Sequence, residues 1–391
     1  MAGNITKLRE GYYRLRYRDE SQYVKAKTDR EAEKLLAKFI TDVDSGDFEQ
    51  PTKVTFKEFA KRWLKDYAEV ELAPKTVYRY KQLLEARIYK AFGDKKLNKI
   101  KPLDLIEFYN LLRKDHKYIS ITKDGKAEEK KCGPLSDQTI QHHHRLLSAI
   151  FEKAIKWGVL KGDNPAKRVD APRVPKHRAK YFDEKQIEAM LEALQDEDIK
   201  YRVAIMIALT TGARMGEIMG LEWQDVDIKS KTISIRQASQ YLPGKGTFTK
   251  APKNESSIRK ISVNPSLITL LEEYKAEQQS KGFLCQDNNR LLLMWNGQPM
   301  HPNTLSEWFP SFLEKHSLPH MNFHGLRHTS ATYLISQGMD IPTVAQRLGH
   351  SKPTTTENIY AHAVESRDKK AARLFEAAVN KKKKETKKSS S

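Results

Sequence analysis

The sequence contains very little cysteine. Only Cys132 and Cys285 occur among 391 residues, with no paired spacing that would indicate a zinc site or a disulfide framework. We interpret both as reduced thiols, which excludes the disulfide-stabilised class of secreted domains. The same observation favours a cytoplasmic location.

Long hydrophobic runs and a secretion signal are also missing. The longest apolar run, "VAIMIAL" at residues 203–209, is far shorter than a segment that spans a bilayer. The first residues carry no hydrophobic signal segment. We therefore expect neither a membrane span nor a membrane partner.

Negative charge is in the minority. Lys and Arg total 70 against 50 Asp and Glu, so the formal net charge is +20. Such an excess favours a polyanionic partner, and nucleic acid is the first candidate. With 39% hydrophobic residues, a chain of this length is expected to form two or three globular domains.

Residues 1–50 are predicted to form a small sheet-plus-helix domain. In "GYYRLRYR" apolar and basic residues alternate, so one strand face packs while the other presents Arg14, Arg16 and Arg18. A second strand, "QYVKAKT", leads into an amphipathic helix that begins with a capping box. The arginine row fits a solvated face, but on so basic a chain we favour contact with DNA.

A basic helical bundle is predicted over residues 53–165. Four segments have apolar stripes at helical spacing, and Thr55 and Glu58 form a capping box before the first. The polar stretch 115–135 within this bundle is interpreted as an exposed hairpin or loop.

The remainder of the chain predicts a linker and a second large domain. Residues 166–180 are rich in proline and basic residues, which favours an extended linker. Residues 181–380 predict a mixed α/β domain, mostly helical, with one small antiparallel sheet, and 381–391 predict a disordered basic tail. The expected fold class is multi-domain, mainly α with small β-sheets.

Three consecutive histidines, His142, His143 and His144, lie within one predicted helix. Consecutive helical side chains diverge by about 100°, so the three cannot converge on one metal ion. We expect them to face solvent or DNA, and we predict no metal site and no cofactor.

The segment "FHGLRHTSATYLISQG" combines a histidine and an arginine on one helical face. His324 and Arg327 are three residues apart, so they project together from a helix. The packing face of this helix is expected to consist of Leu326, Tyr333 and Leu334.

Arg214 follows a glycine that ends an apolar helix in "TGARMGEIMGL". A guanidinium at such a junction can bind an oxyanion with two parallel hydrogen bonds. Two arginines and a histidine on a basic chain, without a metal motif, indicate phosphoryl chemistry on DNA or RNA. The sequence contains no phosphate-binding glycine loop, no carboxylate pair for magnesium and no serine elbow.

A nucleophile for such a reaction has a candidate in "LGHSKPTTTENIYAHA". Asp340 and Gly349 bound a short predicted helix, His350 lies at its exit, and a second capped helix carries Tyr360. A tyrosyl phosphodiester stores the energy of the broken bond, so religation needs no ATP. Considered alone, Tyr360 fits a packed aromatic better than a nucleophile, since most helix tyrosines are structural.

Five segments in order resemble the catalytic domain of the tyrosine recombinases: "TGARMGEI", "PKNESSIRKISV", "HGLRHTSATYL", "LGHS" and "IYAHA". Together with the basic strand module and the helical bundle, this layout resembles the integrases of temperate phages and integrative conjugative elements. The resemblance covers nearly the whole chain. Each motif alone is weak, but the ordered set is specific.

The resemblance implies an active site of six residues. The family's arginine, lysine, histidine, arginine, histidine and tyrosine positions match Arg214, Lys253, His324, Arg327, His350 and Tyr360. Lys250, three residues before the matched lysine, stays open as the alternative. In the implied reaction the tyrosine attacks a DNA phosphate, forming a 3′-phosphotyrosyl link and a free 5′-hydroxyl, and the 5′-hydroxyl of a partner strand then attacks that link.

The resemblance also implies partners. They are double-stranded DNA with core and arm-type attachment sites, three further copies in a homotetramer on DNA, a host bending protein and an excisionase. An arm-type domain of this family carries a three-stranded sheet. The apolar stripe of residues 368–379 is a candidate for docking on a neighbouring copy, and packing on its own domain is equally compatible with the sequence.

Two other functions are compatible with parts of the sequence. A type IB topoisomerase uses nearly the same site to relax supercoiled DNA, although the arm-like N-terminal module argues against it. A non-catalytic DNA-binding regulator would keep the scaffold but not need the complete set of catalytic residues.

Overall fold

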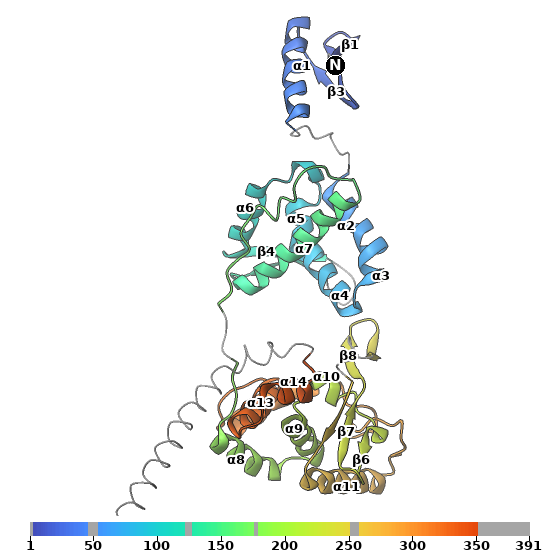
Figure 1. Ribbon diagram of the computed structural model, residues 1–391, viewed down its shortest axis with the longest axis vertical. Helices are drawn as coiled ribbons and strands as arrows, with labels where there is room; N and C mark the ends of the chain where they lie inside the picture. The colour runs from blue at the N-terminus through green and yellow to red at the C-terminus, as the bar shows by residue number, and fades with distance from the viewer. Residues whose placement is uncertain (1–2, 46–53, 122–126, 176–178, 251–257, 351–391) are drawn as a thin grey trace, which may run out of the picture. The chain divides into compact units, whose positions relative to one another are not determined.

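The computed structural model describes residues 3–45, 54–121, 127–175, 179–250 and 258–350 (Figure 1). The chain divides into two compact units, Met1–Lys176 and His177–Ser391. Because the large apolar clusters each lie within one unit, the two units are described separately.

The first unit begins with a three-stranded antiparallel sheet packed on one helix (Figure 1). Its elements are β1 (Asn4–Arg9), β2 (Tyr12–Tyr17), β3 (Glu20–Lys25) and α1 (Asp29–Asp44). The predicted alternation in β2 is confirmed, because Tyr13, Leu15 and Tyr17 are buried. β1 was not predicted from its residues. It is an edge strand in which only Ile5 is partly buried, so it shows no apolar alternation.

Arg18 does not lie on the predicted strand face. β2 ends at Tyr17, and Arg18 follows it with a φ of 51°, in the left-handed region that turns favour. Its guanidinium lies 2.9 Å from Asp44 of α1, so it is directed toward the helix. The arginine row on β2 therefore consists of Arg14, which is half-buried, and Arg16, which is exposed.

A helical bundle follows in the same unit (Figure 1). Its helices are α2 (Phe56–Trp63), α3 (Glu69–Glu71), α4 (Pro74–Leu83), α5 (Tyr89–Phe92), α6 (Pro102–Leu112) and α7 (Asp137–Lys156). The capping box of Thr55 and Glu58 starts α2 as predicted, since each residue accepts a hydrogen bond from the other's backbone N–H. Wider π-helical turns, Leu64–Ala68 and Leu84–Ile88, continue two of the helices.

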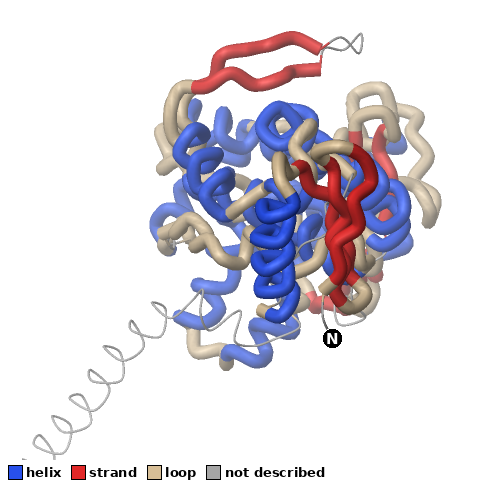
Figure 2. The backbone as a smooth tube through the Cα atoms, turned by 90° about the horizontal axis from the view of Figure 1, so that it is seen from above, coloured by secondary structure: helices blue, strands red, loops and turns tan. Residues whose placement is uncertain are grey.

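The polar stretch in the bundle is a β-hairpin. β4 (His116–Ile121) and β5 (Ala127–Cys132) pair antiparallel, and Figure 2 shows them side by side with the undescribed turn between them in grey. Arg87 holds the base of this hairpin, donating a hydrogen bond of 2.9 Å to His116 Nε2. The prediction of an exposed hairpin or loop is thus resolved in favour of the hairpin.

The residues that begin the predicted linker pack on the bundle. Asn164 is buried and donates a hydrogen bond of 2.9 Å to the carbonyl of Ser148 on α7. Ala166 is completely buried, and Val169 packs against the same core. Residues 170–175 have no regular structure, so the bundle extends about four residues beyond its predicted end.

The expectation for the three histidines is wrong for His143. Its ring is fully buried in the bundle, where Nδ1 lies 2.9 Å from the carbonyl of Thr139. Burial lowers its pKa to about 4, so the ring is neutral at pH 7. Only His142 is exposed, while His144 is half-buried beside the hydroxyl of Tyr109. His143 lies three residues after Ile140 and four before Leu147, so helical spacing places it on the buried face of α7.

The second unit is mostly helical (Figure 1). Its helices are α8 (Glu184–Ala193), α9 (Ile199–Thr211), α10 (Met215–Ile218), α11 (Pro265–Ser280), α12 (Thr304–Lys315), α13 (Gly325–Ser336) and α14 (Ile341–Leu348). The central helix α9 is apolar on most sides and packs against both α11 and α13. Within the described residues, no helix is long and apolar enough to cross a membrane.

The described residues of this unit form two small sheets rather than the single one predicted. The strands are β6 (Val226–Asp227), β7 (Thr232–Ile235), β8 (Ala238–Leu242), β9 (Gly246–Lys250) and β10 (Arg259–Ser262). β10 returns to pair with β7 in a three-stranded sheet, while β8 and β9 form a separate hairpin. Alternation identifies strands but not their partners, because pairing depends on contacts distant in sequence.

Candidate active site

Arg214 lies at the junction predicted from the sequence. Gly212 ends α9 in the left-handed conformation, with a φ of 62°, and Arg214 occupies the N-cap position of α10. Its backbone N–H and its Nη1 both donate to the carboxylate of Glu217, at 2.9 and 2.8 Å. The side chain of Arg214 remains 41% exposed, so its guanidinium is accessible to a ligand.

Glu217 links Arg214 to a second, buried arginine. Arg259 of β10 donates to Glu217 Oε2 at 2.8 Å, and the two side chains are only 6% and 8% exposed. Burial alone would raise the pKa of Glu217, but the hydrogen bonds and charges of Arg259 and Arg214 hold it below its usual value. The carboxylate is therefore ionised and can orient both guanidinium groups.

Arg259 also contacts the end of α14. Its Nε donates to the carbonyl of Arg347 at 2.7 Å, and Arg214 Nη2 lies 3.5 Å from the carbonyl of Gly349. The C-terminal carbonyls of a helix carry partial negative charge, which two guanidinium groups here offset. As predicted, α14 begins after Asp340 and ends at Gly349, so that His350 follows directly.

The H-x-x-R pair lies at the start of α13. Arg327 is buried and donates from Nη1 to the carbonyl of Gly212 at 2.7 Å, so it reaches the turn that precedes Arg214. His324 occupies the N-cap position of the same helix. Burial and the charges of Arg327 and Arg214 lower the pKa of His324.

The charges of Arg327 and Arg214, which lower the pKa of His324, also act on His350. Burial, followed by the charges of Arg327, Arg214 and Arg259, lowers its pKa to about 4. His350 is thus neutral at pH 7 and able to donate a hydrogen bond without adding charge. The structure therefore brings together four of the predicted residues, Arg214, His324, Arg327 and His350.

The charge balance of this cluster favours an anionic ligand. The charges of Arg214, Arg259 and Arg327 all act on His350, and Glu217 is the carboxylate that pairs with two of these arginines, Arg214 and Arg259. Positive charge in a half-buried site is costly unless an anion offsets it, and a phosphate presents oxygens in the geometry that guanidinium groups bind. An arrangement of this kind can bind an anion such as a phosphodiester and can stabilise added negative charge on it.

Two predicted catalytic residues, Lys253 and Tyr360, lie outside the described residues, as does the segment 368–379. The alternative lysine, Lys250, is half-buried at the end of β9. Within the part of the chain that the structure describes, no cluster of His, Cys, Asp or Glu is arranged to hold a metal ion.

One predicted packing residue of α13 is not in the core. Leu326 is fully buried and Leu334 is partly buried, but Tyr333 is 42% exposed. Tyr333 lines an open groove with Leu191 of α8 and Met206 of α9. The prediction from helical spacing that Tyr333 belongs to the packing face of α13 is therefore wrong.

Arg259 and Arg347 were not found by sequence reasoning. Arg259 lies in "IRKISV", where alternation marks only a strand, and Arg347 donates to the backbone carbonyls of Thr210 and Ser262. Their partners lie more than 40 residues away along the chain, so no local pattern indicates that these guanidinium groups are buried.

Two segments of the chain match known family descriptions. Residues 180–367 match the phage integrase family, and residues 55–113 match the phage integrase N-terminal SAM-like domain. The first match spans the cluster of Arg214, Arg327 and His350, and the second lies within the helical bundle.

Relatives with similar sequences include a tyrosine recombinase XerC-like protein from Caldanaerobacter subterraneus subsp. tengcongensis, which is 26% identical over 370 residues. That match covers 86% of this chain and 87% of the relative. The ICEBs1 integrase of Bacillus subtilis is 26% identical over 241 residues, covering 61% of this chain and 65% of the relative.

Solved structures extend the similarity to the fold. The Tn1549 transposon integrase in complex with a circular intermediate DNA is 25% identical, with a TM-score of 0.63 over 81% of this chain and 98% of that chain. A lambda integrase dimer bound to a COC′ core site has a TM-score of 0.55 at 17% identity, over 91% and 94% of the two chains. The latter likeness is one of fold alone.

Proposed function

Because the chain belongs to the phage integrase family of tyrosine recombinases, we propose that it is a site-specific recombinase that integrates and excises a mobile element. It cuts and rejoins DNA through a 3′-phosphotyrosyl link on Tyr360. The observation that carries this proposal is the convergence of Arg214, Arg327, His324 and His350 at one half-buried cationic site. Such a site has the chemistry that a reacting phosphodiester requires.

Cleavage is a transesterification. The phenolic oxygen of Tyr360 attacks the phosphorus, the bond from phosphorus to O5′ breaks, and O5′ takes up a proton and leaves as a hydroxyl. Lys253, or alternatively Lys250, donates that proton, while His324 assists transfer of the phenolic proton. Rejoining reverses these steps with the 5′-hydroxyl of the partner strand, so no ATP is consumed.

The arginines act on the charge that develops during this reaction. Arg214 and Arg327 hydrogen-bond the non-bridging oxygens, and each charge-assisted contact contributes on the order of 1.5 to 3 kcal/mol. His350 adds a neutral donor, since its pKa of about 4 keeps it unprotonated at pH 7. Glu217 holds Arg214 in place through two hydrogen bonds.

The partner is double-stranded DNA. The Tn1549 transposon integrase, which is 25% identical to this chain, has been solved in complex with a circular intermediate DNA, and the net charge of +20 fits such a ligand. Exchange between two duplexes needs four active sites, so a homotetramer assembles on the DNA. A host bending protein and an excisionase take part, and the protein acts at the nucleoid in the bacterial cytoplasm.

The N-terminal sheet has a separate DNA-binding role in this proposal. Arg14 and Arg16 of β2 bind arm-type sites, while the bundle and the catalytic unit bind the core site. Residues 53–169 and 181–380 are the corresponding core-binding and catalytic domains, and the basic tail 381–391 adds non-specific attraction.

A two-plasmid recombination assay tests the function. One plasmid carries the attachment site of the element, the other carries the site of the host, and joint molecules are scored by sequencing across the junctions. Joint molecules with the wild type and none with Tyr360→Phe are expected. Relaxation of supercoils without joint molecules would instead identify a topoisomerase, and sequence-specific DNA binding without either joint molecules or relaxation would identify a regulator.

A further inference from the structure

The hairpin β8–β9 ends at Lys250, one of the two lysines considered for protonation of the leaving group. Its first strand lies directly against α10, whose N-cap residue is Arg214. A Cβ atom at Gly220 would lie 3.0 Å from the backbone nitrogen of Ser239, and one at Gly216 would lie 3.2 Å from the carbonyl oxygen of Ser239. These two glycines therefore allow the backbone of β8 to approach α10 closely.

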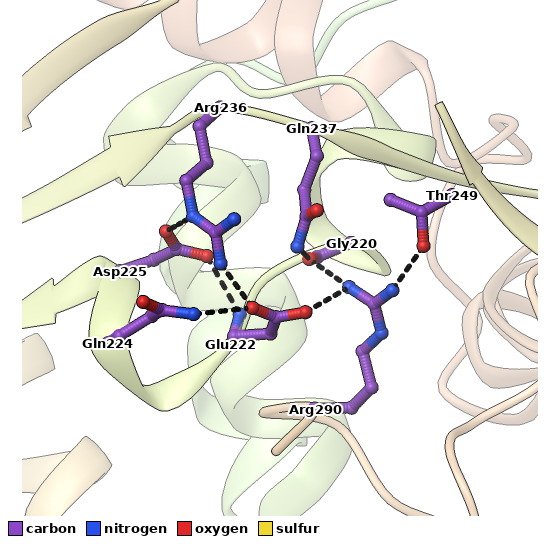
Figure 3. A network of polar contacts seen from close by, with 8 residues as sticks. All are labelled: Gly220, Glu222, Gln224, Asp225, Arg236, Gln237, Thr249 and Arg290. Carbon is purple, nitrogen blue, oxygen red and sulfur yellow. Dashed lines mark hydrogen bonds and ion pairs between the residues drawn. The ribbon is translucent and has the colours of Figure 1, made fainter. Parts of the chain in front are cut away.

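The second strand, β9, is held by a side chain from a distant loop. Arg290 donates from Nη2 to the hydroxyl of Thr249 on β9, at 2.5 Å (Figure 3). The same guanidinium donates from Nη1 to the carbonyl of Gly220, and it lies 3.2 Å from the carboxylate of Glu222. One side chain, only 18% exposed, thus joins β9 to the segment that follows α10.

Glu222, the carboxylate that pairs with Arg290, is itself held by other side chains. Arg236 contacts the carboxylates of both Glu222 and Asp225, and Gln224 donates to Glu222 Oε2 at 2.8 Å (Figure 3). Gln237 at the start of the hairpin donates to the carbonyl of Gly220 at 2.8 Å. The network contains two arginines and two carboxylates, so its charges balance and it needs no ligand.

We propose that Arg290 is a positioning residue for leaving-group protonation, because it fixes the lysine-bearing strand β9 relative to Arg214. This inference rests on the proposed recombinase function. Arg290 acts through the hairpin and does not touch the DNA phosphate. When the bond between Arg290 and Thr249 is lost, β8 stays attached to α10. Strand β9 then no longer holds Lys250, at its end, at a fixed distance from the DNA phosphate.

The chemistry of the leaving group allows a specific test. During cleavage the bond from phosphorus to O5′ breaks, and the departing oxygen needs a proton from the lysine ammonium. When sulfur replaces O5′, the departing thiolate is stable without a proton, because the pKa of a thiol is about 8.5. A defect in proton donation therefore disappears on the sulfur substrate, whereas a defect in DNA binding or in arginine placement remains.

The experiment compares single-turnover rates of covalent complex formation on two nicked core-site duplexes, one with oxygen and one with sulfur at the 5′-bridging position. The variants are Arg290→Met and Thr249→Val. Thr249→Val removes only the hydroxyl that accepts the bond from Arg290 and leaves the contacts with Gly220 and Glu222 in place. The matched control is Thr247→Val, two residues earlier on the same face of β9.

On the oxygen substrate, we expect both variants to react about 10- to 100-fold more slowly than the wild type, while Thr247→Val reacts normally. On the sulfur substrate, Thr249→Val should return to within about threefold of the wild-type rate. DNA affinity should not change, because no DNA-contacting group is altered.

Equal slowing on both substrates, or no slowing of Thr249→Val on the oxygen substrate, would overturn the positioning role. If Arg290→Met loses its fold, the exposed Thr249→Val substitution still decides the question. A wild-type protein that forms no covalent complex on either duplex would contradict the recombinase function itself, so the two failures are distinguishable.

Discussion

Arg259 connects two parts of the candidate site, the segment that carries Arg214 and the end of α14 that precedes His350. Its guanidinium bonds the carboxylate of Glu217, which orients Arg214, and the carbonyl of Arg347, close to His350. A Cβ atom at Gly349 would lie 2.9 Å from Arg259 Nη1, so the backbone after α14 approaches this side chain closely. At the scale of single residues, this buried ion pair connects the carboxylate that orients Arg214 to the end of α14.

Replacement of Arg259 by Met is expected to lower the free energy of unfolding by about 3–5 kcal/mol, because it leaves Glu217 buried with one charge partner fewer. Arg259→Lys should be intermediate, since an ammonium cannot serve the carboxylate and the carbonyl as a planar fork does. Urea unfolding measures both. The double variant Arg259→Met with Glu217→Gln should recover part of the loss, and simple additivity of the two single effects would contradict the account.

His143 predicts a pH dependence of stability for the bundle. Its pKa is about 4 in the folded protein and 6.5 as the ordinary value, so only the unfolded chain takes up a proton between these pH values. Stability is therefore unaffected above pH 6.5 and falls as the pH drops below it, by about 2 kcal/mol at pH 5. His143→Asn keeps a donor for the carbonyl of Thr139 but does not titrate.

Thermal unfolding of both proteins from pH 7.5 to 5 measures this effect. The wild type should lose more stability on acidification than His143→Asn, and His142→Asn serves as a control because His142 is exposed. Parallel pH profiles for all three proteins would show that His143 does not titrate as described.

At this scale, motifs in the sequence and the packing of side chains have to be considered separately. Arg214, His324, Arg327 and His350 came from their motif, and the structure brings them together. Burial of His143 was missed although the pattern carried a signal, since the residue lies three after Ile140 and four before Leu147 on the apolar stripe of α7.

At the scale of elements, the turn at Gly212 connects three parts of the site. It ends α9, it presents its carbonyl to Arg327, and it leads directly into Arg214. A Cβ atom at Gly212 would lie 2.4 Å from Leu348 of α14, the helix that precedes His350. The left-handed turn thus fixes the relative positions of α9, α13 and α14.

Gly212→Ala is expected to destabilise the protein by more than the roughly 1–2 kcal/mol that a left-handed alanine costs, because Leu348 and α14 must also shift. It should also slow covalent complex formation. Gly282→Ala is the matched control, since Gly282 has a φ of 78° and would place its Cβ in open space. Equal destabilisation by the two substitutions, measured by urea unfolding, would remove the role assigned to the Leu348 contact.

Element boundaries were predictable where their determinants are local. The caps at Thr55 and Asp340 and the terminating Gly349 all lie within a few residues of the helices they bound. The separation of β8–β9 from the β10-β7-β6 sheet was not predictable, because it depends on pairing across more than 20 residues.

At the scale of the whole molecule, the chain combines a small basic sheet module, a bundle and a catalytic unit. The residues described around Arg214, such as Glu217 and Arg327, belong to the unit His177–Ser391. Arg14 and Arg16 of the sheet module belong to the other unit. Cleavage of a core site and assembly of an integration complex should therefore depend on different parts of the protein.

Deletion of residues 1–50 is expected to leave cleavage of a core-site duplex within about threefold of wild type and to reduce integration at least 10-fold, since each lost phosphate contact weakens arm binding. A full-length Arg14→Ala/Arg16→Ala variant keeps the sheet and should show the same pattern. Cleavage gels and the two-plasmid assay measure the two activities. Undiminished integration by the truncated chain would refute the arm-site assignment.

The proposed reaction requires a covalent bond between Tyr360 and DNA. The most direct measurement is mass spectrometry of the covalent complex trapped on a nicked core-site duplex, after digestion of both the protein and the DNA. We expect a nucleotide attached through its 3′-phosphate to the peptide that contains Tyr360, and no adduct with Tyr360→Phe. An adduct on another residue, or a link through a 5′-phosphate, would contradict it.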